Sequence, residues 1–492
     1  MTHSTLILAI DQGTSCTKAL LLGLNGEVVA KGAVPVGVSY TQHLVEQSPT
    51  ELYQSVLGAV RLCLDGAMRA GIPNSAIKAV GITNQRETFV LWDSRGEPLY
   101  PAVSWQCKRS SAICDDLGGY ETFIKDRTGL IVDPYFSSTK VKWLMEHVPG
   151  IASAISNGEV YFGTIDTWLL YCLTKGRQYL TDHTNASRTM LFNIHRMEWD
   201  SDLIALLGLE GLQLPAACPS VFDYGATDFE GLLDRPIPIT AMIGDSQAAT
   251  VGSDCLQKGQ AKATLGTGCS VMMTVGEQLT ERSVQTVDAI CYSTPDRVVY
   301  ATEGIIVSCG ATVEWLMNQL GLFSNVADSE MLARQAPPDH GVYLLPAFSG
   351  MGTPYWRKNS RAVIANLSFA SDRNCVVRAA LESVGFQVCD VVKAMEQEHG
   401  VRLTELTVNG GMASNGFVLQ FLSNLLDIPV YSNAVPDASA FGCAFLAATQ
   451  LGVGSFSLGT VREWRHEVGP DGGQSQVLSA YDGWLSCMEK ML

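Results

Sequence analysis

The stretch LILAIDQGT at residues 6–14 is an apolar run that ends in the polar turn Asp11-Gln12-Gly13-Thr14. A second turn of the same type, Leu265-Gly266-Thr267-Gly268, also follows an apolar run and lies in the other half of the chain. Glycine lets backbone N–H groups approach oxyanions closely, and a threonine hydroxyl adds a further hydrogen-bond donor. Either turn alone is consistent with an ordinary hairpin, but the pair predicts two halves of one phosphate-binding clamp.

The residues around these turns indicate which phosphate compound they bind. Asp11 offers a carboxylate, which is a preferred ligand of hard cations such as Mg²⁺. A third glycine turn, Gly410-Gly411, follows the strand predicted over residues 403–408. The carboxylate, the hydroxyls and the glycine turns together predict a site for a magnesium-bound triphosphate. The sequence contains no GxxxxGK[ST] motif, so a P-loop enzyme is excluded.

Chain length and residue pattern predict an α/β protein of two domains. The 492 residues exceed the size at which a single hydrophobic core normally keeps growing. Short apolar strands alternate with helices in both halves, which predicts a duplicated mixed sheet. One amphipathic helix is predicted from residue 49 to about 70, where Ser48 and Glu51 form a capping box. The boundary is predicted near residue 252, giving domains 1–252 and 253–492.

Charge and cysteine usage narrow the class of protein further. The formal net charge of -16 argues against nucleic acid or an anionic membrane as the main partner, because phosphate groups would be repelled. The 14 cysteines form no CxxC pair, so they are expected to be reduced thiols in a cytoplasmic protein. No apolar run approaches the roughly 18 residues of a membrane span, and the run at residues 6–10 is too short for a signal peptide.

Two further strand ends carry polar residues suited to chemistry on an alcohol. Asp245 follows the apolar run at residues 239–243, and the pair Arg86 and Glu87 follows the run at residues 78–83. Arginine offers forked donors and glutamate offers acceptor oxygens, which suits a compound with adjacent hydroxyl groups. The alternatives are structural: Asp245 would cap a helix, and Arg86 and Glu87 would form an ion pair in an exposed turn.

Beyond these local features, essentially the whole chain resembles a known family. The glycine turns are similar to those of the actin, hexokinase and heat-shock ATPase superfamily, and the detail resembles the FGGY carbohydrate kinases, closest to glycerol kinase. The most specific matching stretches are Gly81–Glu87 (GITNQRE), Asp133–Ser137 (DPYFS), Thr184–Phe192 (TNASRTMLF) and Pro346–Gly350 (PAFSG). This resemblance implies two actin-like (ribonuclease H-like) domains, with mixed sheets flanked by helices and the active site in the cleft between the domains.

The resemblance also implies an activity and the residues that perform it. The expected reaction is ATP-dependent phosphorylation of glycerol to glycerol 3-phosphate by in-line transfer, with Asp245 as general base. Asp11 would hold Mg²⁺ through water. The N-terminal domain would bind the polyol and the phosphates, and the C-terminal domain would bind ATP.

The resemblance assigns the remaining site residues position by position. The expected substrate-binding residues are Arg86, Glu87, Trp105, Tyr135, Asp245, Ser246 and Ser270. The expected nucleotide-binding residues are Thr14, Ser15, Cys16, Lys18, Thr267, Gly310, Glu314, Gly411 and Asn415. Cys16 is included for its place beside the first turn, while its thiol itself is expected to pack.

Four positions depart from the glycerol kinase pattern. Ser246 stands where glutamine is usual and Ser270 where phenylalanine is usual, which leaves room for an acceptor larger than glycerol. Lys18 replaces an arginine and lacks its forked geometry. Glu314 replaces a glutamine and loses the amide donors, so nucleotide preference stays open.

Two alternatives therefore remain open. One is an FGGY kinase of a larger polyol or ketose, such as erythritol, dihydroxyacetone or a pentulose. The other is an actin-like ATPase module without small-molecule kinase activity, although the polar loops at residues 84–87 and 133–137 argue against it. The resemblance also makes a homodimer or homotetramer plausible, while the residue pattern locates no interface.

Overall fold

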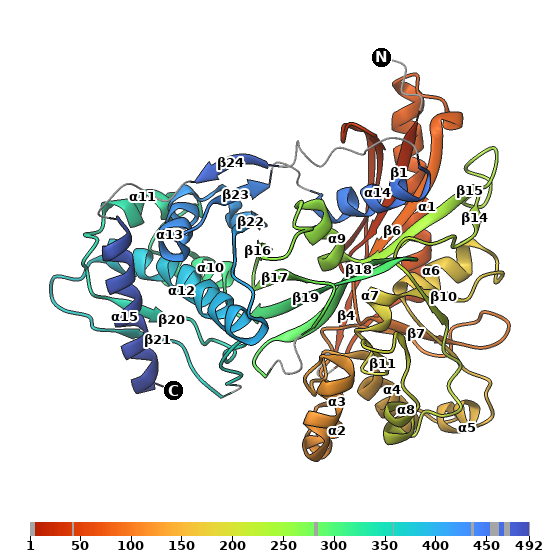
Figure 1. Cartoon of the computed structure of the whole chain (residues 1–492), viewed down its shortest axis with the longest axis horizontal. Coiled ribbons are helices and arrows are strands. Elements are labelled where there is room, and N and C mark those ends of the chain that lie inside the picture. Colours follow the sequence, from red (N-terminus) through yellow and green to blue (C-terminus); the bar gives the residue numbers. More distant parts are fainter. Residues whose placement is uncertain are drawn as a thin grey trace. The chain divides into compact units, whose positions relative to one another are not determined.

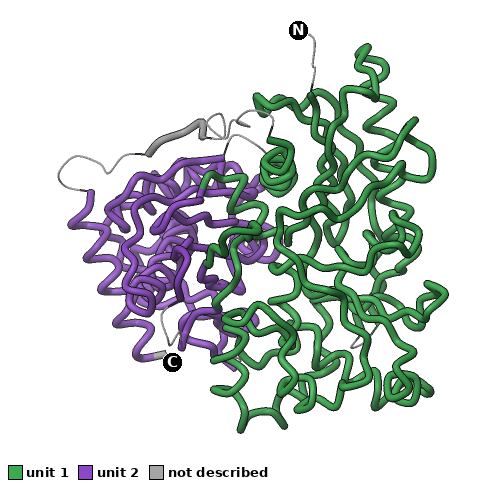
Figure 2. The backbone as a smooth tube through the Cα atoms, turned by 45° about the vertical axis from the view of Figure 1, so that its right-hand side comes forward, with its two compact units in different colours: residues 1–254, 288–300, 437–458 green, residues 255–287, 301–436, 459–492 purple. Residues whose placement is uncertain are grey.

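The computed structural model describes residues 5–41, 44–279, 284–357, 359–433, 437–452, 462–466 and 473–491. The chain forms two compact units, drawn in green and purple in Figure 2. Unit 1 contains residues 1–254, 288–300 and 437–458, and unit 2 contains residues 255–287, 301–436 and 459–492. Each unit therefore combines segments that are far apart in the sequence.

Unit 1 is built on a six-stranded mixed sheet with the strand order β14-β15-β6-β1-β2-β3. The strands β1, β2 and β3 form an antiparallel meander, while β6 and β15 run parallel to β1. In sequence order, the strands are β1 Leu6–Gln12, β2 Cys16–Gly23, β3 Val28–Pro35, β6 Ile77–Asn84, β14 Ala226–Thr227 and β15 Ile237–Gly244. The apolar run at the start of the chain, residues 6–10, lies within β1.

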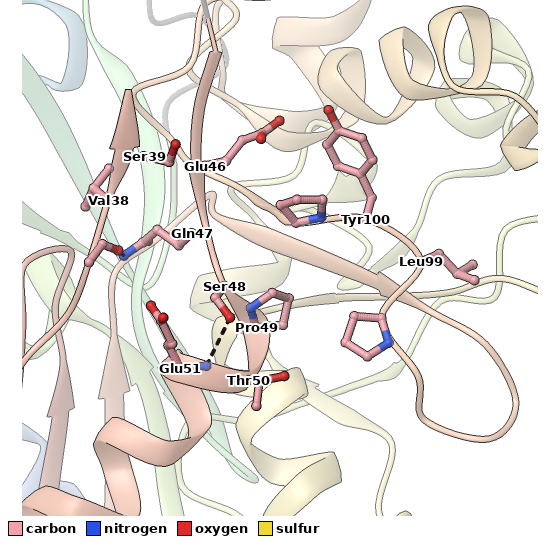
Figure 3. A pocket seen from close by; sticks show the side chains of 13 residues that line it. Val38, Ser39, Glu46, Gln47, Ser48, Pro49, Thr50, Glu51, Leu99 and Tyr100 are labelled. Carbon is pink, nitrogen blue, oxygen red and sulfur yellow. Dashed lines mark hydrogen bonds between the residues drawn. The ribbon is translucent and has the colours of Figure 1, made fainter. Parts of the chain in front are cut away.

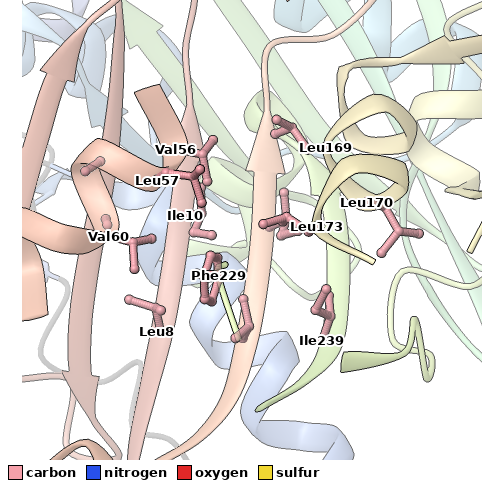
Figure 4. Packing of buried hydrophobic residues seen from close by; sticks show 14 of the residues in the cluster. Leu8, Ile10, Val56, Leu57, Val60, Leu169, Leu170, Leu173, Phe229 and Ile239 are labelled. Carbon is pink, nitrogen blue, oxygen red and sulfur yellow. The ribbon is translucent and has the colours of Figure 1, made fainter. Parts of the chain in front are cut away.

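Helices cover both faces of this sheet. Leu6, Leu8 and Ile10 belong to a buried cluster with α1 (Pro49–Arg69) and α6 (Ile165–Leu173), as Figure 4 shows for part of it. Successive side chains of a strand point to opposite faces, so the intervening residues of β1 face the other side. There α14 (Ala438–Gln450) packs against β1, β6 and β15 (Figure 1).

The start of α1 has the predicted cap. The Ser48 hydroxyl accepts a hydrogen bond from the backbone N–H of Glu51 at 3.3 Å, which satisfies one otherwise unpaired donor of the first turn.

A β-carbon at Gly81 of β6 would lie only 2.7 Å from the Cys443 sulfur of α14. The absence of a side chain at residue 81 therefore lets this helix lie against the sheet.

We expect Leu8→Ala to lower the free energy of unfolding by about 2–5 kcal/mol, because Leu8 is completely buried and its removal leaves a cavity. The matched control is Leu62→Ala on α1, whose side chain is 47% exposed and whose loss should cost about 0.5 kcal/mol or less. Urea denaturation followed by circular dichroism measures both. Equal midpoints for the two variants would contradict the assignment of Leu8 to the core.

The rest of unit 1 adds smaller sheets and short helices. A five-stranded sheet has the order β4-β5-β8-β7-β9, with β4 Ser39–Thr41, β5 Leu44–Gln47, β7 Phe89–Trp92, β8 Ala102–Val103 and β9 Tyr161–Thr164. Two further pairs are β10 Leu180–Asp182 with β13 Ala216–Cys218, and β11 Phe192–Asn193 with β12 Glu198–Trp199. The short helices are α2 Ser111–Asp116, α3 Glu121–Thr128, α4 Ser137–His147, α5 Ile151–Ser156, α7 His183–Ala186, α8 Ser201–Leu207 and α9 Asp245–Gly252. Two 3₁₀ turns are η1 Asn74–Ala76 and η2 Gly118–Tyr120.

Unit 2 repeats the mixed-sheet plan. Its strands follow the order β19-β17-β16-β22-β23-β24, with β16 antiparallel to β17 and parallel to β22. The strands are β16 Gln260–Leu265, β17 Cys269–Gly276, β19 Arg297–Ile306, β22 Glu405–Asn409, β23 Val430–Asn433 and β24 Arg462–His466. β18 (Val287–Thr294) precedes β19, and residues 288–300 of this hairpin are grouped with unit 1.

Helices flank the unit 2 strands. They are α10 Gly310–Asn318, α11 Asp328–Gln335, α12 Arg373–His399, α13 Gly416–Leu426 and α15 Gly473–Met491, with the 3₁₀ turn η3 Gly411–Ser414 and the hairpin β20 Tyr343–Leu345 and β21 Val363–Ala365. The prediction of an α/β chain with a mixed sheet flanked by helices in each half is confirmed. The exact boundary near residue 252 stays a prediction. Among the described helices, none is both long and apolar enough to cross a lipid bilayer.

Candidate active site

The sheet of unit 1 brings three predicted site segments to one edge. In register, Gln12 of β1 lies beside Asn84 of β6, and Asn84 lies beside Gly244 of β15. All three strands are parallel, so the residues that follow them emerge at the same edge, where α/β proteins commonly bind ligands. Strand order therefore brings the Asp11 turn, the Arg86 loop and Asp245 together.

Arg86 connects the two predicted acidic residues. Its Nε lies 3.4 Å from Asp245 Oδ1 and 4.0 Å from Glu87 Oε1. The Arg86 side chain is 5% exposed, whereas that of Asp245 is 37% exposed. A β-carbon at Gly244 would lie 2.8 Å from Arg86 Cγ, so glycine leaves the path of this arginine open. The buried guanidinium of Arg86 thus orients the Asp245 carboxylate, which solvent and small molecules can reach.

Glu87 is held on several sides. Its backbone has a positive φ of 61°, an uncommon conformation for a residue with a side chain and one often found at functional sites. Its Oε1 accepts a 2.6 Å hydrogen bond from Arg188 Nε, and its carbonyl accepts one of 2.8 Å from the Ser137 hydroxyl. Arg188 and Ser137 belong to stretches that resemble the family, although neither was predicted as a site residue. Arg188 thus holds the Glu87 carboxylate, and Ser137 holds its backbone.

The predicted aromatic residues are adjacent. The rings of Trp105 and Tyr135 lie 5.5 Å apart in an edge-to-face arrangement. Lys140, which sequence reasoning missed, donates from Nζ to the Tyr135 carbonyl at 2.9 Å. Burial lowers the pKa of Lys140 to about 8, against the opposing effect of the Glu87 charge. A lysine in an amphipathic helix normally lies in solvent, so no local signal identified it.

Thr14 connects the first glycine turn to this aromatic pair. Its hydroxyl accepts a hydrogen bond from Trp105 Nε1 at 2.9 Å and donates one to Gln85 Oε1 at 3.2 Å. The Thr14 carbonyl accepts a further bond from Gln47 Nε2 at 2.9 Å. The Thr14 hydroxyl has a single proton, which it donates to Gln85, so in this structure the hydroxyl is bonded to neighbouring side chains. The side chains of Gln47 and Gln85 are a second group that sequence reasoning missed.

Gln47 also lines a larger surface pocket of unit 1, shown in Figure 3. This pocket has a volume of about 780 Å³ and is formed by the segments 37–39, 46–51 and 98–101. The predicted site residues lie outside its lining. This pocket is therefore not the predicted active site, although it is large. The predicted site residues lie instead at the edge of the six-stranded sheet.

Asp11 lies in a cluster of charges. It stands opposite Lys18 in the β1–β2 hairpin, and Lys18 Nζ lies 2.8 Å from Asp437 Oδ1. Lys31 Nζ contacts the other oxygen of Asp437. Burial, and then the negative charge of Asp245, raises the pKa of Asp11 to about 7 despite the nearby Lys18. Two carboxylates that disfavour each other's charge are suited to sharing a cation.

The remaining predicted residues of the first half lie around the turn and Asp245. Ser15 is exposed, and Cys16 and Ser246 are half-buried. The backbone N–H of Ser246 donates to Asp245 Oδ1 at 2.6 Å. Ser270 lies on β17 of unit 2, where its hydroxyl donates to the buried Glu303 at 2.9 Å. Its expected place beside the substrate stays a prediction.

Unit 2 gathers its predicted nucleotide-binding residues in one pocket of about 430 Å³. The predicted residues in its lining are Thr267, Gly310, Glu314, Gly411 and Asn415. They come from the β16–β17 turn, α10, η3 and the start of α13. Because Thr264 of β16 lies beside Asn409 of parallel β22, the two glycine turns emerge together.

Glycines allow the backbone segments of this pocket to pack directly on one another. The Gly310 N–H donates to the Gly266 carbonyl at 2.8 Å, and a β-carbon at Gly310 would lie 2.6 Å from that oxygen. Gly410 has a φ of +89°, and a β-carbon there would lie 2.5 Å from the Leu265 carbonyl oxygen. Gly310 is therefore required for space, and Gly410 for both space and backbone conformation.

Two polar side chains of the pocket lining, Asn415 and Glu330, hold the start of α13. Asn415 Oδ1 accepts from the Val418 N–H at 3.1 Å and caps α13. Glu330, which sequence reasoning missed, accepts from the Gly416 N–H at 3.0 Å and pairs with Arg334 at 2.7 Å. Glu330 lies on a separate helix, so its position depends on how α11 packs against α13.

Two family models cover most of the chain. The N-terminal domain of the FGGY family of carbohydrate kinases matches residues 6–252, and its C-terminal domain matches residues 261–451. The chain is 41% identical over 490 residues to a glycerol kinase of Symbiobacterium thermophilum, covering 98% of each chain. It is also 41% identical over 452 residues to glycerol kinase 2 of Thermotoga maritima, covering 91% of this chain and 90% of the relative.

Solved structures agree with this relationship. The Plasmodium falciparum glycerol kinase with ADP superposes with a TM-score of 0.92 at 28% identity, covering 99% of this chain and 98% of that one. A xylulose kinase from Rhodospirillum rubrum shares the fold, with a TM-score of 0.88 at 20% identity and coverage of 99% and 98%. The fold, the glycine turns and the two family matches lead to one conclusion: the chain belongs to the FGGY family of carbohydrate kinases.

Proposed function

We propose that this chain transfers the terminal phosphoryl group of ATP to a hydroxyl of glycerol, forming glycerol 3-phosphate. The observation that carries the proposal is the accessible Asp245 carboxylate held 3.4 Å from buried Arg86, beside Glu87. This group offers a base, a forked donor and an acceptor at one sheet edge. Relatives named glycerol kinase that align along nearly the full chain support the choice of acceptor.

Each polar group has a defined part in the proposed reaction. Arg86 donates to, and Glu87 accepts from, adjacent hydroxyl groups of the polyol. Trp105 and Tyr135 pack against its carbon chain and exclude water. Asp245 accepts the proton of the attacking hydroxyl as the new O–P bond forms and the bond between the terminal phosphorus and ADP breaks.

We assign nucleotide binding to both parts of the chain. The pocket of unit 2 would hold the nucleotide, with Thr267 and Gly411 near its phosphates and Glu314 and Asn415 near the adenosine. Thr14, Ser15, Cys16 and Lys18 would contribute phosphate contacts from the first glycine turn and the strand after it. Residues 1–252 would thus form the domain that binds polyol and phosphate, and residues 253–492 the domain that binds ATP.

We further propose that Asp11 holds Mg²⁺ through water. The donor set fits a divalent cation, because burial and the Asp245 charge disfavour the ionised Asp11 carboxylate until a positive charge approaches. When bound, the cation would offset negative charge on the triphosphate. Asp11, at the start of the first glycine turn, would hold the hydrated cation through its carboxylate.

We expect Asp11→Asn to raise the Mg²⁺ concentration for half-maximal activity by about tenfold or more, as is usual when an outer-shell ligand is lost. A Mg²⁺ titration at saturating ATP measures this. Asp223→Asn is the matched control, since this exposed carboxylate lies on a loop and accepts from the Gly225 N–H at 3.0 Å. Identical Mg²⁺ dependence in both variants would remove Asp11 from the cation site.

The acceptor is tested by comparing kcat/KM for glycerol, dihydroxyacetone, erythritol and a pentulose in a coupled ADP-release assay. We expect the highest value for glycerol. A preference for a pentulose or erythritol would favour the larger-acceptor alternative, which Ser246 and Ser270 suggest. ATP turnover that responds to none of these compounds would favour the ATPase module.

We propose that the protein is located in the cytoplasm. Within the described residues the fourteen cysteines form no disulfide, which supports a reducing compartment such as the cytoplasm.

We also propose a homodimer or homotetramer, by analogy with the family. Light scattering coupled to size-exclusion chromatography measures the assembly directly, and a monomer at micromolar concentration would contradict it.

A further inference from the structure

A buried polar segment, to which the proposed reaction assigns no part, overlaps the stretch that resembles the family at residues 184–192. We call residues Asp182–Arg188 the 182–188 segment; it comprises the last residue of β10, the helix α7 and the two residues after it. Asp182, Thr184 and Asn185 are all completely buried. Buried polar side chains cost free energy unless every group is satisfied, so their contacts show what the segment holds in place.

The Asp182 carboxylate accepts five hydrogen bonds. Its Oδ1 accepts from the Thr184 hydroxyl at 2.8 Å and from Asn185 N and Nδ2 at 2.9 and 2.8 Å. Its Oδ2 accepts from Thr184 N at 3.0 Å and from the Ser220 hydroxyl at 2.8 Å. Burial, and then the charge of Asp166, raises the pKa of Asp182 to about 7, but Oδ1 faces two N–H donors of Asn185 and is therefore an acceptor. Its contact with Thr184 thus fixes the direction of the threonine O–H bond.

Thr184 passes this orientation to the residue before Asp245. Because the single hydroxyl proton of Thr184 points to Asp182, its oxygen lone pairs are left to accept. They accept the Gly244 N–H at 2.9 Å. Gly244 ends β15 and is the N-terminal cap residue of α9, whose first residue is Asp245. This hydrogen bond therefore holds the peptide from which the Asp245 side chain projects.

The same segment also reaches the Arg86 loop. Asn185 and Asn84 exchange reciprocal side-chain hydrogen bonds of 3.0 and 3.1 Å, and Asn84 Nδ2 donates to the Gln85 carbonyl at 2.9 Å. At the end of the segment, Arg188 donates to Glu87. One buried segment thus contacts the backbone before Asp245 and both sides of the polyol-binding pair.

We infer that Thr184 is a positioning residue for Asp245: its hydroxyl, oriented by Asp182, fixes the Gly244 peptide and so the direction of the Asp245 carboxylate. This inference rests on the proposed function, in which Asp245 is the base. Thr184 is completely buried, so in this inference it acts through Gly244 and not by binding substrate or nucleotide. Its loss should therefore lower kcat and leave substrate affinity largely unchanged, because small errors in the placement of reacting groups act on the chemical step.

The test compares Thr184→Val with Thr128→Val. Thr128 is an equally buried threonine, and its hydroxyl likewise donates once, to Ile124 O at 2.8 Å, and accepts once, from Leu130 N at 3.1 Å. Both variants lose one buried hydroxyl, so both should lose similar thermal stability. We expect Thr184→Val to lower kcat by about 10- to 100-fold, with KM for glycerol within about threefold. Thr128→Val should keep the wild-type kcat.

Rescue and a double-mutant cycle separate positioning from general damage. Thr184→Ser keeps the hydroxyl and should restore kcat to within about threefold of wild type, and Thr184→Ala replaces the valine variant if that variant does not fold. Adding Thr184→Val to Asp245→Asn should lower the residual rate by less than about threefold, since both act at one group. Equal kcat in Thr184→Val and Thr128→Val, or a full further loss in the double variant, would overturn the inference.

Failure of the proposed function gives a different pattern. A wild-type kcat in Asp245→Asn would reject Asp245 as the base, whatever the Thr184 variants show. Crystal structures of the wild type and Thr184→Val provide a readout that needs no turnover. The inference expects the Asp245 carboxylate to be displaced in the variant, and an unmoved carboxylate would overturn it even if glycerol proved not to be the acceptor.

Discussion

Asp245→Asn should lower kcat for glycerol phosphorylation by about 10²- to 10⁴-fold, which is the usual contribution of a positioned general base. Asparagine keeps the size of the side chain and a possible hydrogen bond to Arg86, so the ligand pocket should persist and KM should change little. What is lost is the ability to accept the proton of the attacking hydroxyl. Steady-state kinetics with glycerol and ATP, each varied separately, measure both quantities.

A matched variant controls for the loss of a carboxylate at a helix start. Asp202 also lies in the first turn of a short helix, α8, and pairs with an arginine, Arg127, at 3.5 Å. Asp202→Asn therefore removes a similar charge and ion pair away from the sheet edge. Its kcat should match the wild type. If both variants kept wild-type turnover, the phosphorylation chemistry would need another base.

The second large effect concerns the nucleotide pocket. Gly410→Ala should weaken ADP binding by about 10- to 100-fold, because a residue with a side chain in this backbone conformation costs roughly 1–3 kcal/mol. Gly410 has φ +89° and ψ -179°, and its β-carbon would overlap the Leu265 carbonyl group of β16. Since the Leu265 carbonyl belongs to the backbone and no rotamer change moves a β-carbon, the clash can only be relieved by moving one turn away from the other. The residues that follow, Gly411 and Asn415, would then leave their places in the pocket lining.

Isothermal titration with ADP measures this change, and Gly400→Ala is the control. Gly400 also has a positive φ, of 60°, but nothing lies within 4 Å of its added β-carbon. It ends α12 in a left-handed cap, so its replacement should cost about 1 kcal/mol of stability without changing ADP affinity. Equal ADP affinity in the two variants would show that the Gly410 turn does not build the nucleotide site.

The two predictions concern different parts of the chain and fail independently. Loss of ADP binding with glycerol binding intact would locate the nucleotide in the pocket of unit 2. Loss of kcat with both ligands bound would locate the base at the sheet edge of unit 1. Thermal-shift measurements with glycerol and ADP report on each ligand, because a ligand that binds only the folded protein raises its melting temperature.

Local sequence determined the strands, the turns and the chemistry carried at each strand end. The short apolar run before Asp11, bounded by a polar turn, predicts a buried strand, and the conformation at Gly410 favours glycine. Asp245 and Arg86 were identified because polar residues that closely follow an apolar run emerge at a sheet edge, and because the family resemblance assigns them roles. These properties depend on a residue and its near neighbours, which is why the pattern along the chain predicts them.

Tertiary structure alone decided which of these residues meet. The strand order β15-β6-β1 places Asp245 beside Arg86, and the return of the chain to unit 1 brings Asp437 to Lys18 across more than four hundred residues. The buried Lys140 and the Thr184 contact with Gly244 have no local signal either. Such pairs depend on strand register and on the packing of distant elements. Their hydrogen bonds and charges form only when the whole unit has folded, so residue type and spacing cannot specify them.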